Sequence, residues 1–171
     1  MLKIIYSILM LFVCTTTGCI TENEPQGPSI KVGESLPAFS VEMNNGEVIS
    51  TSSLSGKVPV IVFFNTDCSD CQRELPVIQE LWEDYQSTPE VSIVLIAREE
   101  SEEQIDEYWK KNNLTMPYSP QDNRDIYSLF APSVIPRIYI ADRTGKIVMA
   151  YDDSDMPSLS ALKQVINSIL A

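Results

Sequence analysis

The sequence contains no histidine among its 171 residues. This absence excludes His-ligated zinc sites, Ser-His-Asp triads and Cys-His nucleophile pairs together. Basic residues are also scarce, with 12 Lys and Arg against 24 Asp and Glu, which gives a formal net charge of -12. Because nucleic acids and anionic lipid surfaces are bound through basic side chains, this composition argues against both as partners.

The longest hydrophobic run lies at the start of the chain. Lys3 precedes the apolar stretch Ile4 to Val13, which has the length of a secretory signal core. Thr16-Thr17-Gly18-Cys19 then resembles the cleavage box of bacterial lipoproteins, whose Cys is lipidated and becomes the first residue of the mature chain. We therefore expect a lipoprotein signal peptide over residues 1–18 and lipidation of Cys19. An ordinary signal peptide that is cut nearby is the alternative.

Only four cysteines are present, and two of them fall in this leader region. Cys14 would be removed with the signal peptide and Cys19 would be acylated, so Cys68 and Cys71 can pair only with each other. A disulfide that closes so short a loop restricts the unfolded chain very little. A redox role is therefore favoured over a structural staple.

The stretch 58–76, VPVIVFFNTDCSDCQRELP, joins a strand to this cysteine pair and then to a helix. The unbroken apolar run Val60–Phe64 is typical of a central parallel strand that is covered on both faces. Apolar side chains recur at helical spacing over 75–85, which puts Cys68 at a helix N-terminus, where free N–H groups favour a thiolate. Cys71 lies one turn further on and can resolve a mixed disulfide at Cys68, so the arrangement predicts thiol-disulfide exchange.

The rest of the chain predicts one α/β domain over residues 36–171. Residues 19–35 combine Pro, Gly and acids without periodicity and are predicted to be a flexible tether. A β-hairpin is expected around Asn44-Asn45-Gly46, and Pro76 should kink the helix after the cysteines. Together with the later elements, this predicts a mixed central sheet with helices on both faces and an N-terminal β-hairpin.

The later elements are read from local signals. A buried strand is expected over 91–97, and a capping box at Ser101-Glu102-Glu103-Gln104 starts a helix. A short helix over 125–130, a second hairpin around 142–145 and an amphipathic closing helix from Leu159 complete the order. The acidic run before and within the capping box is interpreted as a solvated face; its members are Glu99, Glu100, Glu102 and Glu103.

Four features together resemble the thioredoxin superfamily, and within it the membrane-anchored, extracytoplasmic TlpA-like or ResA-like reductases. They are the strand VIVFFNT, the motif Cys68-Ser69-Asp70-Cys71, the following Glu74-Leu75-Pro76, and Ile135-Pro136 just before a strand. The resemblance covers roughly residues 33–171. It implies a thioredoxin-like three-layer sandwich that needs no cofactor and no metal.

The resemblance also implies roles for individual residues. Cys68 would be the exposed nucleophile and Cys71 the resolving thiol. Glu74 matches a glutamate linked to thiol protonation and would accept the proton of Cys71. Pro136 matches a cis-proline opposite the cysteines, where the backbone of Ile135 would pair with an extended substrate peptide.

One position departs from the family, which has Trp immediately before the first cysteine where this chain has Asp67. The usual apolar docking surface is therefore in doubt. Asp67 and Asp70 oppose a thiolate about as strongly as the helix terminus favours it, and Arg73 is expected to point to solvent. Because a strongly stabilised thiolate makes an oxidant, this acidic setting favours a reductant.

The sequence therefore predicts a thiol-disulfide oxidoreductase in the bacterial cell envelope, lipid-anchored at Cys19 and either periplasm-facing or surface-exposed. It would reduce disulfides in exported proteins and would itself be re-reduced by a membrane thiol electron donor. One alternative is a copper-binding or delivery protein that uses the two thiolates as soft ligands. Another is a peroxiredoxin-like thiol peroxidase, although its Pro-x-x-x-Thr-x-x-Cys pattern is not matched, because Thr66 lies only two residues before Cys68. A third is a scaffold that cycles no electrons.

Overall fold

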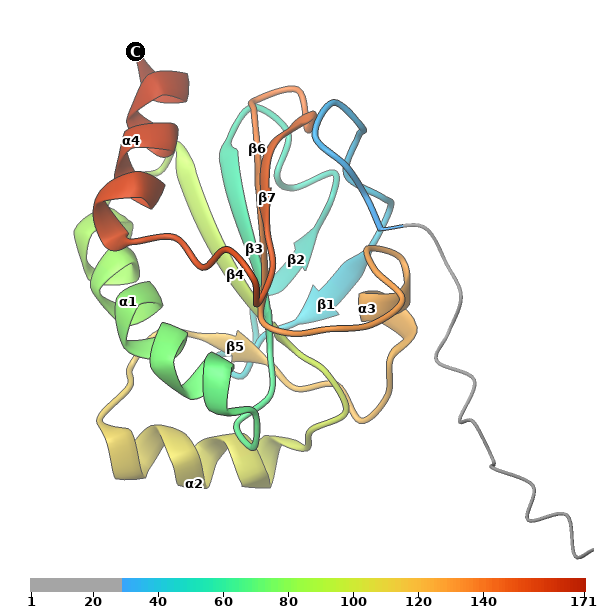
Figure 1. Ribbon diagram of the computed structural model, residues 1–171, viewed down its shortest axis with the longest axis vertical. Helices are drawn as coiled ribbons and strands as arrows, with labels where there is room; N and C mark the ends of the chain where they lie inside the picture. Colours follow the sequence, from blue (N-terminus) through green and yellow to red (C-terminus); the bar gives the residue numbers. More distant parts are fainter. Residues whose placement is uncertain (1–28) are drawn as a thin grey trace, which may run out of the picture.

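The computed structural model describes residues 29–171, so the predicted signal peptide, Cys19 and most of the predicted tether lie outside the described residues. The elements in chain order are β1 Ser40–Glu42, β2 Val48–Ser50, β3 Val58–Phe64, α1 Ser69–Tyr85, β4 Val91–Ala97, α2 Glu102–Asn112, β5 Tyr118–Ser119, α3 Asp125–Ser128, β6 Arg137–Ala141, β7 Ile147–Tyr151 and α4 Leu159–Leu170. The expected mixed sheet, flanking helices and N-terminal hairpin are confirmed (Figure 1).

β3 is the central strand of a five-stranded sheet with the order β5-β4-β3-β6-β7. It pairs with β4 in parallel and with β6 in antiparallel orientation, and all of its residues are buried. Its β-branched and aromatic side chains suit a strand covered on both faces. The β1–β2 hairpin forms a separate two-stranded sheet around the predicted turn.

Neighbouring residues of β3 anchor the layers on the two faces of the sheet, because successive side chains point to opposite sides. Phe64 packs against Trp109 of α2, with ring centroids 5.2 Å apart. Phe63 packs edge-on against Tyr127 of α3 at 5.3 Å and against Phe130 at 4.8 Å. Helices α1 and α4 lie side by side on one face, and α3 and the β1–β2 hairpin lie on the other (Figure 1).

The parallel pairing of β3 and β4 determines where the site forms. Phe64 is paired with Ala97, so the two strands end at the same edge of the sheet. The segments that follow, 65–68 and 98–100, therefore leave the sheet side by side. The N–H of Arg98 donates to the carbonyl of Phe64 at 2.9 Å, and Asn65 Nδ2 donates to the carbonyl of Arg98 at 3.1 Å.

Two details differ from the sequence expectation. β5 was not predicted, because a two-residue strand carries no periodicity and is defined only by its pairing with β4. Residues 30–35 were assigned to the tether, yet Ile30 donates to the carbonyl of Phe130 at 2.8 Å and Gly33 to that of Ile147 at 2.8 Å. Backbone pairing of this kind leaves no periodic signal in such a short segment, and it extends the packed chain to Ile30. Within residues 29–171, none of the helices has both the length and the apolar character needed to span a membrane.

Candidate active site

Cys68 is the N-cap residue of α1. Its backbone is extended, with φ -82° and ψ 119°, and its sulfur accepts a hydrogen bond from the N–H of Cys71 at 3.4 Å. Its carbonyl accepts the first helical hydrogen bond, from Gln72, at 2.9 Å. The sulfur thus takes the place that a Ser or Asp oxygen often has at a helix start, where N–H groups lack helical partners. The predicted position of Cys68 at the helix N-terminus is confirmed.

The two sulfurs differ strongly in exposure. Cys68 is half-buried, whereas Cys71, in the first turn of α1, is 0% exposed. Burial raises the pKa of the Cys71 thiol well above its ordinary value, and a hydrogen bond with Cys68 raises it further. Both cysteines are free thiols in this structure. Cys68 is therefore the sulfur that a visiting molecule can reach.

The loop before β6 brings a backbone carbonyl to Cys68. The Cys68 thiol donates to the carbonyl of Ile135 at 3.5 Å, and the Ile135–Pro136 bond is cis, as expected. The hydroxyl of Tyr127 donates to the carbonyls of Ser133 and Val134 and so holds this loop in place. The predicted site residues Cys68, Ile135 and Pro136 thus lie together, although Pro136 is far from Cys68 in sequence.

Glu74 lies one helical turn after Cys71 and is buried, with 6% of its surface exposed. Among the described residues, its Oε1 atom has no hydrogen-bond partner. Burial raises the pKa of this carboxyl group to about 7, because a carboxylate loses solvation in such a place. The group can therefore change its protonation state near neutral pH.

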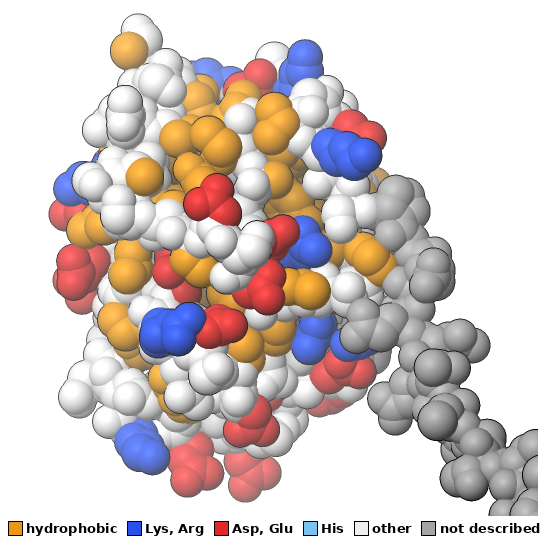
Figure 2. All heavy atoms as spheres, viewed as in Figure 1, with side chains coloured by type: hydrophobic (Ala, Val, Ile, Leu, Met, Phe, Trp, Pro, Cys, Tyr) orange, Lys and Arg blue, Asp and Glu red, His pale blue; other side chains and the backbone are white. Residues whose placement is uncertain are grey.

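A cleft of about 500 Å³ opens beside Cys68. Asp67, Arg124, Val134 and Ile135 are among the residues that line it. Asp67 also lines a second cleft, of about 480 Å³, between the start of α1 and α2. Acidic and basic side chains are interspersed over the face that Figure 2 shows. A partner that reaches Cys68 therefore meets a charged surface and not only an apolar one.

The acidic residues around Cys68 have different partners. Asp70 forms an ion pair with Arg73, whose side chain is 75% exposed, as expected. Asp67 is exposed, and in the described part of the chain its carboxylate forms no hydrogen bond or ion pair. It is therefore the carboxylate next to Cys68 that is free to meet a ligand.

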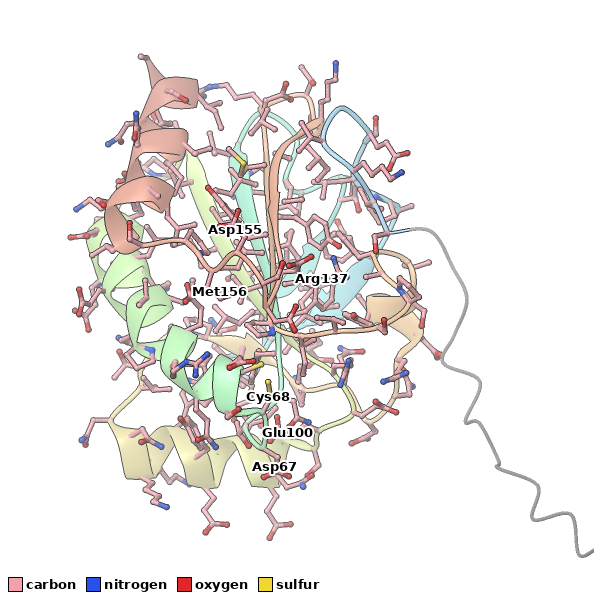
Figure 3. The ribbon with its side chains drawn as sticks, in the orientation of Figure 1. Asp67, Cys68, Glu100, Arg137, Asp155 and Met156 are labelled. Atoms are coloured by element: carbon pink, nitrogen blue, oxygen red, sulfur yellow. The ribbon has the colours of Figure 1, made fainter. Side chains whose placement is uncertain are left out.

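One member of the acidic run was interpreted wrongly. Glu100 was taken for part of a solvated face, but it is 2% exposed and accepts hydrogen bonds from the N–H and the hydroxyl of Thr66. These bonds attach Glu100 to the loop that carries Asp67 and Cys68, and the three labels lie close together in the view of Figure 3. Its position three residues after the strand paired with β3 is the one sequence signal that could have revealed this contact. Cys19, the predicted lipidation site, lies outside the described residues.

Comparison with known proteins gives a consistent result. Residues 32–150 match the AhpC/TSA family. The chain is 27% identical over 146 residues to thiol-disulfide oxidoreductase ResA of Oceanobacillus iheyensis, an alignment that covers 82% of this chain and 76% of that protein. It is also 27% identical over 142 residues to thiol-disulfide oxidoreductase ResA of Bacillus subtilis, covering 82% of this chain and 79% of that protein.

The solved structures show the same fold. The solution structure of a candidate protein disulfide isomerase from Bacteroides thetaiotaomicron superposes with a TM-score of 0.76 at 28% identity. That match covers 82% of this chain and 91% of the solved chain. The similarity therefore spans both the sheet and the segment that carries the two cysteines.

The unequal exposure of the two sulfurs predicts selective alkylation. Iodoacetamide at pH 7 should modify Cys68 at least about tenfold faster than Cys71, because Cys71 is buried and its pKa is raised. Mass spectrometry of the labelled peptide after partial reaction measures the ratio. Denaturation before labelling provides the control and should make the two rates similar. Equal labelling of the folded protein would contradict this assignment.

Proposed function

The chain belongs to the AhpC/TSA family and is a thiol-disulfide oxidoreductase with a thioredoxin-like fold, and from this premise we propose that Cys68 and Cys71 form its redox-active dithiol. One observation carries the proposal: a half-buried Cys68 at the start of α1 stands next to a buried Cys71, whose N–H donates to the Cys68 sulfur. The Cys68 sulfur is accessible to a substrate, and the Cys71 sulfur is shielded from solvent.

The proposed reaction has two exchange steps. The thiolate of Cys68 attacks one sulfur of a substrate disulfide, the substrate S–S bond breaks, and the second substrate sulfur leaves as a thiolate. Cys71 then loses its proton and attacks the Cys68 sulfur, which forms the Cys68–Cys71 bond, breaks the mixed disulfide and expels the first substrate sulfur as a thiolate. Two electrons pass from the dithiol to the substrate. The carbonyl of Ile135, which accepts from the Cys68 thiol, lies where an extended substrate chain would pass.

Glu74 is the group we assign to the proton of Cys71. The raised pKa of Cys71 means that its thiol needs a base before it can attack. Glu74 lies one turn away on the same helix, is buried, and has a pKa of about 7. A base with a pKa near the working pH combines sufficient ionisation with sufficient basicity.

The direction we propose is reduction of disulfides in exported proteins. Asp67, at the position where the resembled family has Trp, puts a negative charge beside the nucleophile, which disfavours a highly stabilised thiolate. The protein would be re-reduced by a membrane thiol electron donor. The leader over residues 1–18 and the lipidation box at Cys19 support a lipid-anchored protein that faces the periplasm or the cell surface.

The alternative functions have separate consequences. A copper carrier would bind copper(I) tightly through the reduced Cys68 and Cys71 without turning over a disulfide. A thiol peroxidase would consume peroxide and would need a Thr hydroxyl at its cysteine. Here the hydroxyl of Thr66 donates its hydrogen bond to Glu100 and not to Cys68. A scaffold would do neither.

Turnover and trapping test the dithiol. The protein should catalyse insulin reduction by dithiothreitol, and Cys68→Ser should abolish this activity because no nucleophile remains. Cys71→Ser should accumulate mixed disulfides with exported proteins when the full chain is expressed in a bacterium, because nothing resolves them. Non-reducing gels followed by mass spectrometry detect them.

The matched control is Cys68→Ser, which should capture nothing under the same conditions. Tight copper(I) binding without insulin turnover would instead support the metal carrier. A reduction potential near that of a strong oxidant, about -120 mV, would reverse the proposed direction.

Glu74→Gln tests the proposed base through two pH profiles. Because the pKa of Glu74 is raised from 4.5 to about 7, the folded chain holds this proton more tightly than the unfolded chain. The free energy of unfolding should therefore fall as the pH rises from about 4.5 to about 7. Glu74→Gln should remove this loss, so at pH 8 its free energy of unfolding should exceed that of wild type by up to about 3 kcal/mol. The rate of disulfide exchange should rise near pH 7 in wild type and should not rise there in Glu74→Gln. Urea unfolding and stopped-flow kinetics at pH 5 and pH 8 measure both.

Glu80→Gln is the matched control, because Glu80 is exposed on the same helix. This variant should leave both pH profiles unchanged. If Glu74→Gln gained stability but kept the wild-type rate profile, Glu74 would be buried without serving as the base.

Asp67→Asn tests the charge beside the nucleophile. Wild type should reduce the cationic disulfide cystamine faster than the anionic 3,3′-dithiodipropionate, because unlike charges about 7 Å apart in water attract by about 0.6 kcal/mol. Removing the charge should lower this rate ratio about sevenfold, because it removes both the attraction of the cation and an equal repulsion of the anion. Glu90→Gln is the control, because Glu90 is an exposed acid at the opposite end of β4. An equal change in both variants would show that only the overall charge matters.

A further inference from the structure

Glu100 is a carboxylate buried in a place that ordinarily disfavours charge. It lies three residues after the end of β4 and is 2% exposed. Its backbone is fixed by an antiparallel bridge to Gln121, with N–H to carbonyl distances of 2.8 and 3.2 Å. Its side chain reaches across to the loop between β3 and α1, beside Asp67 and Cys68 (Figure 3).

The partner of Glu100 is Thr66, two residues before Cys68. The N–H of Thr66 donates to Glu100 Oε2 at 2.9 Å, and its hydroxyl donates to Oε1. The carbonyl of Thr66 accepts from Gln72 Nε2 at 2.7 Å. The three polar groups of Thr66 are therefore all bound by side chains. Glu100, beyond β4, binds the N–H and the hydroxyl, and Gln72 of α1 binds the carbonyl.

Burying the Glu100 carboxylate costs solvation free energy, and its hydrogen bonds to Thr66 hold the turn before Cys68 in place. Burial raises the pKa of Glu100, and the two hydrogen bonds from Thr66 lower it again, so they offset part of the desolvation. Asn65, the residue before Thr66, is tied to Arg98 through its side chain, and its carbonyl accepts from the N–H of Cys68 at 3.2 Å. The turn that leads to the nucleophile is thus fixed to the segment after β4.

We propose that Glu100 is a positioning residue for thiol-disulfide exchange, because its two hydrogen bonds to Thr66 fix the turn that presents Cys68 to substrate and to Cys71. This inference rests on the proposed function of the dithiol. Within residues 29–171, Glu100 forms no hydrogen bond with either sulfur, so its effect on Cys68 passes through Thr66. A displaced sulfur would meet both the substrate and Cys71 at a poorer angle, and small misplacements of reacting groups can cost large factors in rate.

The test compares three forms of Thr66. Thr66→Val removes the hydroxyl with little change in shape and should slow reduction of hydroxyethyl disulfide about tenfold. It should also lower the equilibrium constant for oxidation of the dithiol by glutathione disulfide about tenfold, because a loosened turn closes the Cys68–Cys71 bond less readily. Thr66→Ser restores the donor and should recover both values to within about twofold of wild type.

Thr51→Val is the matched control. The Thr51 hydroxyl donates to the carbonyl of Pro37 at 2.7 Å and accepts from the N–H of Phe39 at 2.9 Å, away from the cysteines. It should lose stability as Thr66→Val does and leave the rate and the equilibrium constant unchanged. If Thr66→Val does not fold, Glu100→Asp, which withdraws both oxygens by one methylene, should show the same tenfold losses.

The outcomes separate the two proposals. If wild type reduces hydroxyethyl disulfide and the folded Thr66 or Glu100 variant does so equally well with an unchanged equilibrium constant, the positioning role is wrong and the dithiol function stands. If Thr51→Val loses as much activity as Thr66→Val, the effect is one of general stability and the positioning role is again wrong. If wild type itself shows no exchange, the proposed function fails first.

Discussion

The chemistry that we propose for this protein depends on the hydrogen bond from the N–H of Cys71 to the sulfur of Cys68 at the start of α1. A helix start offers N–H groups without helical partners, and here one of them meets a sulfur. The bond keeps Cys68 at the surface end of the helix, while the helical path carries Cys71 into the core. The one-turn spacing that brings the two sulfurs together therefore also leaves one exposed to substrate and the other buried. The proposed two-step exchange needs this difference.

That helix start is held in place by the sheet beneath it. β3 is buried on both faces and ends level with β4, so the loops that follow the two strands contact each other. The loop before β6 approaches from the other side of β3 and places the Ile135 carbonyl at Cys68. Three segments distant in sequence thus meet around the cleft beside Cys68 because their strands are neighbours in one sheet.

Local patterns predicted what depends on local sequence. The apolar run of β3, the helical spacing of α1 and the capping box of α2 were sufficient to locate these elements and Cys68, and the family resemblance supplied the cis bond before Pro136. Glu100 was missed, because a run of acids before a helix is usually solvated and only its place after β4, the strand paired with β3, turns this one inward. β5 and the pairing of residues around Ile30 were missed for the same reason, since both are defined by distant partners.

The structure buries two glutamates, Glu74 on the helix of Cys71 and Glu100 at the loop that leads to Cys68. They differ in whether hydrogen bonds offset the free-energy cost of burying the carboxylate. Glu74 has an oxygen without a partner among the described residues, so its pKa rises to about 7 and its proton can leave or return near neutral pH. Glu100 has both oxygens bonded to Thr66, which makes it a fixed acceptor in a rigid turn. An unpartnered carboxyl group suits proton transfer and a fully bonded one suits positioning. The hydrogen-bond partners of each carboxylate, more than its burial, therefore separate the two roles that we assign to Glu74 and Glu100.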